Sequence, residues 1–370
     1  MASTSKREEH LVASNPFNPG FGHVPARVAG RAAIQADLRQ ALEVGRDDPN
    51  LCTLLVGPRG TGKTALLNLS LRWAQELDWA VASVTTGPDM LQQVIEQTML
   101  AVQKLPHVDG VKVKTPVVEV SLTGGLAETG TWRTRMSLLL DALNAKGRGL
   151  LICVDEVLAQ NPTLVSLVAD YQQLSASEGK KVALFMAGLP DNVRGVKKDK
   201  IASFLRRARM QQLGAIPSGD VREAMTLSFA DSGQTIEPRA LDSMVTAIDG
   251  YPYLFQLVGY YTWRYAQGAG VVTAQHAGPG IESARDEMRE TVIDATLADL
   301  SDGDLSFLAA MLPDQETSTL KDLGQRLGRS SGHVSTYKKR LLRAGVLTTV
   351  GRGRVRFALP GLREALEEES

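Results

Sequence analysis

The sequence predicts an α/β protein with a parallel sheet, followed by a helical segment and a small C-terminal winged helix-turn-helix domain. Between residues 51 and 187, short continuously apolar runs alternate with helical segments, which is typical of a parallel sheet covered on both faces. From residue 218 to about 268 the pattern is purely helical, and a glycine-rich linker at 268–279 leads to an acidic helix at 281–297. After residue 301, three helical segments precede two β-rich runs that flank a Gly-Arg-Gly turn.

The composition limits the classes of protein that need to be considered. A chain of 370 residues with 43% apolar residues suits two or three globular domains. The formal net charge is zero, which excludes a uniformly basic nucleic-acid-binding chain, so any basic surface must be local. Cys52 and Cys153 both lie in apolar runs, and two core thiols in a reducing cytosol are a simpler interpretation than a disulfide.

The N-terminal segment is expected to be a polar tail followed by an extended arm, together spanning residues 1–25. Residues 1–10 have no apolar core like that of a secretory signal, and no run approaches the roughly 18 apolar residues of a membrane span. We therefore expect a cytoplasmic protein that does not interact with membranes. The run Asn15-Pro-Phe-Asn-Pro-Gly20 is too rich in proline and glycine for a helix, whereas residues 32–44 have helical spacing.

The α/β part should have its elements in strict alternation. Strands are expected at residues 51–56, 80–85, 149–154 and 182–187, and helices at 63–77, 90–104, 133–145 and 164–177. Residues 106–131 interrupt this pattern with alternating and β-branched runs, which indicate a small hairpin-like insertion.

A glycine-rich loop joins the first strand to the next helix and fits the pattern Gly-x-x-x-x-Gly-Lys-Thr in full. It consists of Gly57, Pro58, Arg59, Gly60, Thr61, Gly62, Lys63 and Thr64, and Ala65 continues the helix. Glycines let successive backbone N–H groups point at phosphate oxygens, and the lysine reaches the β- and γ-phosphates. The threonine hydroxyl is a ligand for Mg²⁺. The loop therefore predicts a site for ATP and Mg²⁺.

An acidic pair ends the strand at residues 149–154, about 90 residues after the loop. Parallel strands present their carboxyl ends at the ligand-binding edge of an open α/β sheet, so Asp155 should hold Mg²⁺ through water. Glu156 would orient or deprotonate an attacking water molecule. Alone the pair could be an ordinary strand end, but with the phosphate loop it indicates hydrolysis.

These motifs and the order of elements resemble the AAA+ superfamily of P-loop ATPases. The similarity is greatest to the branch with an ATPase core, a helical lid and a C-terminal winged helix, which includes the origin-recognition initiators and the archaeal-type STAND signalling ATPases. The resemblance implies an ATPase core at residues 26–216, a lid at 217–268, a linker and acidic helix at 269–300, and a winged-helix domain at 301–370.

Further site residues follow only from this resemblance. The segment Val28-Ala-Gly-Arg31 resembles the box that lines the adenine pocket, although a plain linker would look the same. Pro252 lies in a Gly-x-Pro motif like that which opens a lid helix. Arg206 and Arg207 resemble the arginine-finger region, which implies a homo-oligomer in the ATP state; the alternative is a solvated basic face.

The sequence departs from the AAA+ pattern at two sensors of the γ-phosphate. The strand at residues 182–187 runs into Gly188 where many AAA+ chains have a polar residue, and the lid lacks the usual Gly-x-x-Arg motif. Weaker sensing favours a slow switch over a fast motor.

The C-terminal domain is the basic part of a neutral chain. Helices are expected at residues 305–311, 319–327 and 331–344, the last capped by Ser330 or Ser331 and ended by Gly345, with strands at 346–350 and 355–359. Between residues 321 and 357, ten basic residues face one acidic residue, a net charge of about +9.

Val334 and Leu341 should face the core of this domain, so that the opposite side of their helix is free to enter a major groove. Candidate contacts to duplex DNA on this helix and the wing are Thr336, Lys339, Arg340, Arg343, Arg352, Arg354 and Arg356.

The function expected from the sequence is an ATP-hydrolysing switch that controls the binding of duplex DNA. The main alternative is a STAND-like signalling ATPase whose winged helix binds a protein partner. A third hypothesis, an ATP-binding scaffold without turnover, is disfavoured by the presence of Glu156.

Overall fold

The computed structural model describes residues 14–20, 24–105, 130–158, 161–190, 192–193 and 208–368. These residues form two units. One joins the N-terminal segment up to Gly30 with residues Ala215–Val292, and the other joins Arg31–Gly214 with Ile293 and the residues that follow it. The hairpin-like insertion expected between residues 106 and 131 lies almost entirely outside the described residues.

A five-stranded parallel sheet is the centre of the larger unit, with strand order β2-β3-β4-β1-β5. Its strands are β1 (Cys52–Val56), β2 (Ala80–Thr85), β3 (Leu150–Asp155), β4 (Val182–Gly188) and β5 (Arg209–Gln212). The parallel α/β fold predicted from the sequence is therefore confirmed. Because all strands run the same way, the carboxyl ends of β1 and β3 lie at one edge of the sheet.

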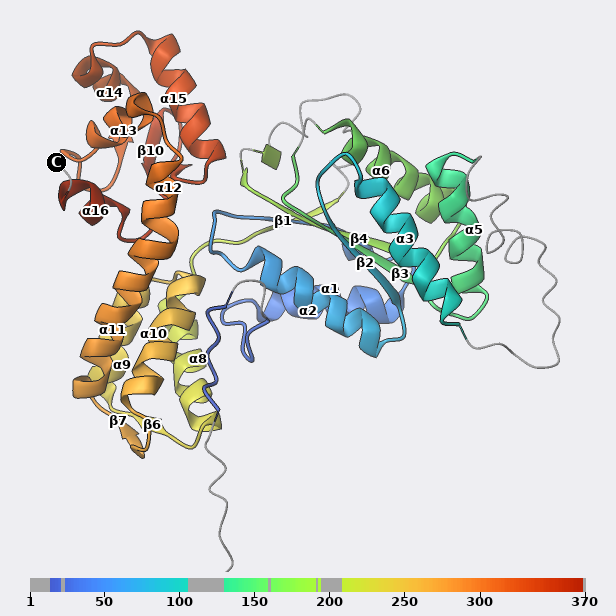
Figure 1. Ribbon diagram of the computed structural model, residues 1–370, viewed down its shortest axis with the longest axis horizontal. Coiled ribbons are helices and arrows are strands. Elements are labelled where there is room, and N and C mark those ends of the chain that lie inside the picture. The colour runs from blue at the N-terminus through green and yellow to red at the C-terminus, as the bar shows by residue number, and fades with distance from the viewer. Residues whose placement is uncertain are drawn as a thin grey trace, which may run out of the picture. The chain divides into compact units, whose positions relative to one another are not determined.

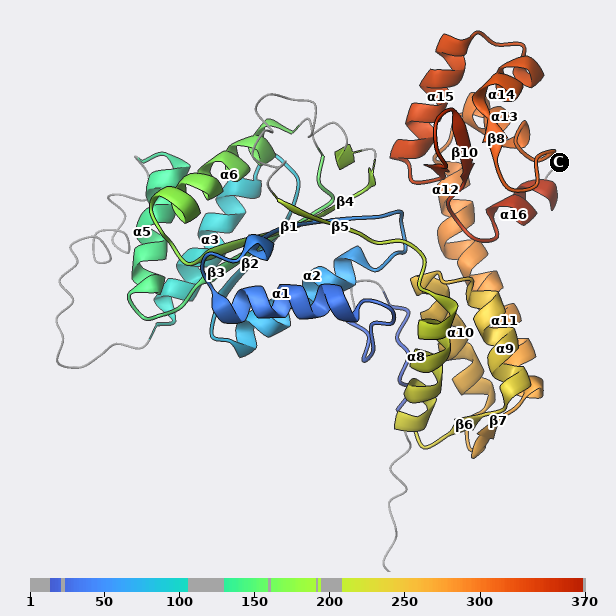
Figure 2. The same ribbon diagram turned by 180° about the vertical axis from the view of Figure 1, so that it is seen from behind.

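Helices cover both faces of this sheet (Figures 1 and 2). One face carries α1 (Ala32–Val44) and α2 (Lys63–Glu76). The other carries α3 (Met90–Gln103), α5 (Trp132–Asn144) and α6 (Pro162–Gln172), the last of which continues as a π-helical turn to Ser177. Fully buried residues such as Leu140, Ile152 and Leu184 form the core on that second face, which explains the unbroken apolar runs of the strands.

The smaller unit is a set of helices, which we call the lid. It contains α8 (Ser218–Asp231), α9 (Pro238–Ile248), α10 (Pro252–Tyr265) and α11 (Ala274–Met288), with a short parallel pair of strands, β6 (Thr235–Ile236) and β7 (Val271–Val272). The helical pattern predicted for residues 218–268 is confirmed.

The glycine-rich linker predicted between residues 268 and 279 is wrong, because α11 already begins at Ala274. Thr273 and His276 form a reciprocal capping box that starts this helix, and Pro279 lies inside it. Gly280 packs against α10 so closely that a Cβ there would lie 2.5 Å from Thr262 Oγ1. Gly280 therefore allows α10 and α11 to approach each other. The predicted acidic helix at 281–297 is the later part of this helical segment, which continues through a π-helical turn into α12 (Ala295–Ala298).

The N-terminal arm is part of the core of the lid. Phe17 is only 2% exposed, and its ring lies 5.1 Å from that of Phe229 and 5.7 Å from that of Phe255 (centroid to centroid). Asn15 Nδ2 donates a hydrogen bond of 3.2 Å to the Tyr260 carbonyl. The arm is extended, as expected, but it is a packed element of the lid.

The C-terminal domain, within the larger unit, has the predicted winged helix-turn-helix form. Its elements are α13 (Asp302–Ala309), β8 (Ser318–Thr319), α14 (Leu320–Leu327), α15 (Ser331–Arg343), β9 (Leu347–Thr349), β10 (Arg354–Phe357) and α16 (Leu362–Glu368). The three strands form an antiparallel sheet in the order β8-β10-β9. Gly345, with φ of 74°, ends α15 as predicted.

Cys52 and Cys153 are free thiols. Burial raises the pKa of Cys52 to about 12, and it raises the pKa of Cys153 further above its usual range. Across the described part of the chain, no helix combines the length and apolar character that a membrane span requires.

Candidate functional site

The glycine-rich loop lies between β1 and α2, where only glycine fits at its turning points. A Cβ on Gly57 would lie 2.5 Å from the Leu213 carbonyl oxygen and 2.7 Å from Thr61 Oγ1. Gly60 and Gly62 have φ values of 70° and 84°, in the left-handed region that disfavours other residues. The loop can therefore hold its backbone close to a ligand, as a phosphate cradle requires.

Lys63 is the first residue of α2 and points back across the loop. Its Nζ donates hydrogen bonds to the carbonyls of Gly57 (2.9 Å) and Pro58 (2.6 Å). Burial lowers the pKa of Lys63 to about 8, against an opposing effect of the nearby Asp155 carboxylate. The ammonium is thus held at the centre of the loop by carbonyl oxygens, a position from which it can turn to phosphate oxygens.

The two sequence motifs meet at the carboxyl edge of the sheet. Thr64 Oγ1 donates a hydrogen bond of 2.6 Å to Asp155 Oδ2, although the residues are 91 apart in the sequence. The other carboxylate oxygen, Oδ1, accepts a bond of 2.8 Å from the Glu156 backbone N–H. A hydroxyl and a carboxylate are the donor types that Mg²⁺ binds, and this ion usually takes its remaining ligands from phosphate and water. The described residues contain no cluster of three or more acidic, histidine or cysteine side chains that could hold a metal ion.

Glu156 has a strained backbone, with φ of 53°. The segments on both sides are tied to neighbouring strands: the Thr86 N–H donates to the Asp155 carbonyl (3.2 Å), and the Val157 N–H donates to the Ala187 carbonyl (2.8 Å). These bonds hold the turn in place and leave the Glu156 side chain exposed at the edge of the sheet. This geometry suits a carboxylate that must reach a water molecule near the phosphate loop.

Gly188 explains why a polar sensor is missing from the end of β4. A Cβ at this position would lie 3.1 Å from Val157 Cβ and 3.2 Å from the Val157 carbonyl oxygen. A larger polar side chain would be crowded by the segment that follows Glu156. The absence predicted from the sequence thus has a packing reason.

The remaining candidate nucleotide contacts that the structure describes are divided between the two units. Arg31 precedes α1, is 7% exposed, and its guanidinium donates to the Gly214 carbonyl. Val28 and Pro252 belong to the lid unit, where Pro252 opens α10 as predicted. Arg206 and Arg207 lie outside the described residues.

The predicted DNA-contacting residues are exposed on the C-terminal domain. Val334 and Leu341 are buried, as predicted. On the wing, the buried Val355 separates two exposed arginines. The exposed candidates are Thr336, Lys339, Arg340, Arg343, Arg352, Arg354 and Arg356.

Arg340 differs from the other exposed candidates because its guanidinium is bonded to two residues of the same domain. Its Nε donates to Asp304 Oδ1 (3.0 Å) and its Nη2 donates to Ser301 Oγ (2.9 Å). The Asp304 side chain is only 6% exposed, and it also forms a capping box with Ser301 at the start of α13. Arg340 therefore links α15 to α13. The signal in the sequence that could have revealed this was the pair Ser301-x-x-Asp304, a capping box that leaves one carboxylate oxygen for a cation.

Solved structures share this architecture over nearly the whole chain. The Walker-type ATPase PABY2304 of Pyrococcus abyssi superimposes with a TM-score of 0.66 at 14% identity, covering 92% of this chain and 96% of that chain. The ORC2 protein of Aeropyrum pernix, solved in complexes with ADPNP and ADP, gives a TM-score of 0.58 at 16% identity, covering 95% and 96%. The chain has the AAA+ fold. The AAA+ resemblance inferred from the sequence is thereby confirmed for the fold.

Residues 290–365 match a family described as a domain of unknown function (DUF8462). The match spans the C-terminal winged helix and the helical turn that leads into it. No curated protein matches the sequence.

Proposed function

We propose that this chain is an ATP-hydrolysing switch that binds duplex DNA through its C-terminal winged helix. The observation that carries the proposal is the contact between Thr64 and Asp155, which joins a complete phosphate loop to an acidic strand end. The relatives' fold adds support, since ORC2 was solved with ADPNP and ADP.

The nucleotide part of the proposal assigns one task to each residue. Backbone N–H groups of Gly57–Thr64, with Ala65, cradle the phosphates, and Lys63 neutralises the β- and γ-phosphates. Thr64 and Asp155 would hold Mg²⁺, which supplies charge neutralisation when bound. Glu156 orients the attacking water and takes its proton. Because Gly188 offers no sensor side chain, we expect slow turnover.

ATP hydrolysis is tested with Lys63→Ala and Glu156→Gln. Lys63→Ala should lose nucleotide affinity as well as turnover, by roughly 100-fold or more in rate. Glu156→Gln should retain ATP binding but lose turnover by roughly 100-fold, since the carboxylate acts only on water. Equal, background-level turnover in the wild type and both variants would instead favour the scaffold hypothesis.

The DNA part depends on charge and exposure. The basic segment carries about nine net positive charges in a neutral chain, and its arginines and lysines are mostly exposed. Binding to a duplex should therefore weaken steeply as salt increases. Lys339→Ala and Arg356→Ala should each reduce the salt slope by about one. Arg239→Ala is the matched control, because it removes an exposed positive charge from α9 in the lid.

Absence of salt-dependent duplex binding would favour the alternative, a STAND-like ATPase whose winged helix binds protein.

The assembly state is a separate part of the proposal. If Arg206 and Arg207 act as a finger on a neighbouring subunit, mass measurements should detect a homo-oligomer with ATP, and Arg206→Ala with Arg207→Ala should lower turnover without weakening nucleotide binding. A monomer that hydrolyses ATP at the full rate would remove this role.

A further inference from the structure

The outer side of the phosphate loop contacts the C-terminal domain within the larger unit. Gly345 has φ of 74° and lies just after α15. A Cβ built on it would lie 3.1 Å from Arg59 Cγ and 3.5 Å from Arg59 Cδ. The aliphatic part of Arg59 therefore covers the end of the helix that we propose to enter DNA.

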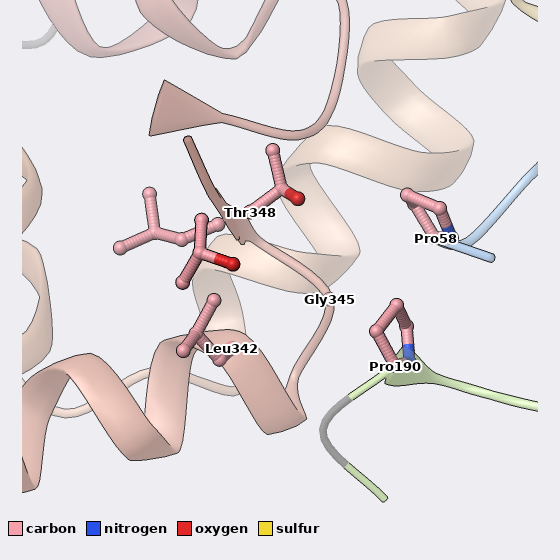
Figure 3. A pocket seen from close by; sticks show the side chains of 7 residues that line it. Pro58, Pro190, Leu342, Gly345 and Thr348 are labelled. Atoms are coloured by element: carbon pink, nitrogen blue, oxygen red, sulfur yellow. The ribbon is translucent and has the colours of Figure 1, made fainter. Parts of the chain in front are cut away.

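A pocket continues this contact (Figure 3). Pro58 of the phosphate loop and Pro190, which follows β4, line one side. The other side is formed by residues from the end of α15 and from β9, namely Leu342, Gly345, Leu347, Thr348 and Thr349. An interface that leaves a pocket between its surfaces loses dispersion contacts, so it is easier to separate than a fully packed one.

Pro58 connects this interface to the position of the phosphates. Its carbonyl accepts the hydrogen bond of 2.6 Å from Lys63 Nζ, while its ring lines the pocket. Phosphate oxygens compete with carbonyl oxygens for a lysine ammonium, and a charged acceptor makes the stronger bond. Binding of a triphosphate should therefore draw Lys63 away from Pro58 and allow the first half of the loop to move.

We propose that Pro58 and Arg59 couple the phosphate site to the DNA-binding face: docking on Gly345 and β9 restrains α15, and binding of a nucleoside triphosphate releases it. This inference rests on the proposed function. It adds a direction, since ATP should strengthen DNA binding, and by thermodynamic reciprocity DNA should strengthen ATP binding by the same factor.

The contact can be tested with cysteines placed at two pocket residues outside the phosphate loop. Pro190→Cys with Thr348→Cys should be joined by a short bifunctional maleimide when no nucleotide is added. The native thiols of Cys52 and Cys153 should not compete, because burial raises the pKa of both. A non-hydrolysable ATP analogue with Mg²⁺ should slow the cross-link about fivefold or more.

Pro190→Cys with Glu316→Cys is the control pair, because the exposed Glu316 precedes β8 at the opposite edge of the small sheet from β9. It should cross-link poorly with or without nucleotide. Efficient cross-linking of the control pair, or an unchanged rate for the pocket pair while the analogue is bound, would overturn the coupling.

DNA affinity supplies the second readout. The wild type and the uncross-linked double variant should bind duplex about fivefold or more tightly with the ATP analogue than without it, and the cross-linked protein should lose this response. If nucleotide and DNA both bind but neither affects the other, the coupling fails, while ATP hydrolysis and DNA binding stand as two separate activities. If either ligand does not bind at all, the proposed function itself fails.

Discussion

The ring of Phe17 fills the space beside Gly259, so that no side chain can be accommodated at position 259. A Cβ built on Gly259 would lie 2.3 Å from Phe17 Cδ1. Residues 242 positions apart in the sequence thus form one packing contact, which makes the N-terminal arm a structural part of the lid.

Replacement of Phe17 by alanine should destabilise the lid by about 3–5 kcal/mol, because the buried ring packs against the rings of Phe229 and Phe255. Urea unfolding would measure the loss, and hydrogen exchange should localise it to α8 and α10. Leu227→Ala, at a residue of α8 that is 40% exposed, is the control and should cost far less. Equal losses in the two variants would show that the arm contributes no specific packing.

Gly250→Ala should also destabilise the lid, by roughly 1–3 kcal/mol. Gly250 has φ of 66°, and a Cβ there would lie 2.5 Å from the Ile216 carbonyl oxygen. Gly268→Ala separates the effect of the positive φ from the effect of the close contact. Gly268 also has a positive φ, 84°, but no atom lies within 4 Å of a Cβ built on it. Thermal unfolding should show a clearly larger decrease for Gly250→Ala, and equal decreases would mean that the backbone contact adds nothing.

Arg340→Ala should destabilise the winged helix by about 1–3 kcal/mol, because it leaves the buried Asp304 carboxylate without its cation. Lys339→Ala, on the neighbouring exposed residue, should leave stability within about 0.5 kcal/mol while it weakens DNA binding. Chemical denaturation and DNA titration of both variants test whether Arg340 contributes to stability and Lys339 to DNA binding. A stable Arg340→Ala variant with strongly reduced DNA affinity would restore Arg340 to the contact face.

Nucleotide affinity should decrease as the pH rises above about 8. Burial lowers the pKa of Lys63 to about 8 in the free protein, whereas bound phosphates favour the charged ammonium and raise that pKa. At a pH between the pKa of Lys63 in the free protein and its pKa in the complex, nucleotide binding takes up a proton. Each increase in pH in this range therefore weakens nucleotide binding. Calorimetry in buffers with different ionisation enthalpies would detect the uptake. Lys63→Arg, whose side chain stays protonated, should lose this pH dependence.

Local patterns in the sequence were sufficient for the sheet, the phosphate loop and the acidic strand end. Continuous apolar runs identify buried parallel strands, and Gly57–Thr64 with Asp155 follow from chemistry that requires those residue types at that spacing. The same patterns failed at residues 268–279, where glycines and a proline indicated a linker. Gly280 lies in α11 and allows this helix to pack closely against Thr262 of α10. Such a contact depends on a second helix, so it leaves no periodic signal in the sequence.

By itself the sequence identified the candidate phosphate loop and the place where basic charge accumulates, because both depend on residue type and short spacing. Only the tertiary structure decided that Thr64 forms a hydrogen bond with Asp155, that Arg340 forms an ion pair with Asp304 and that Phe17 packs in the lid. Each of these contacts joins residues from different elements. Whether such a contact forms depends on how the strands and helices pack, and that packing is a property of the whole fold.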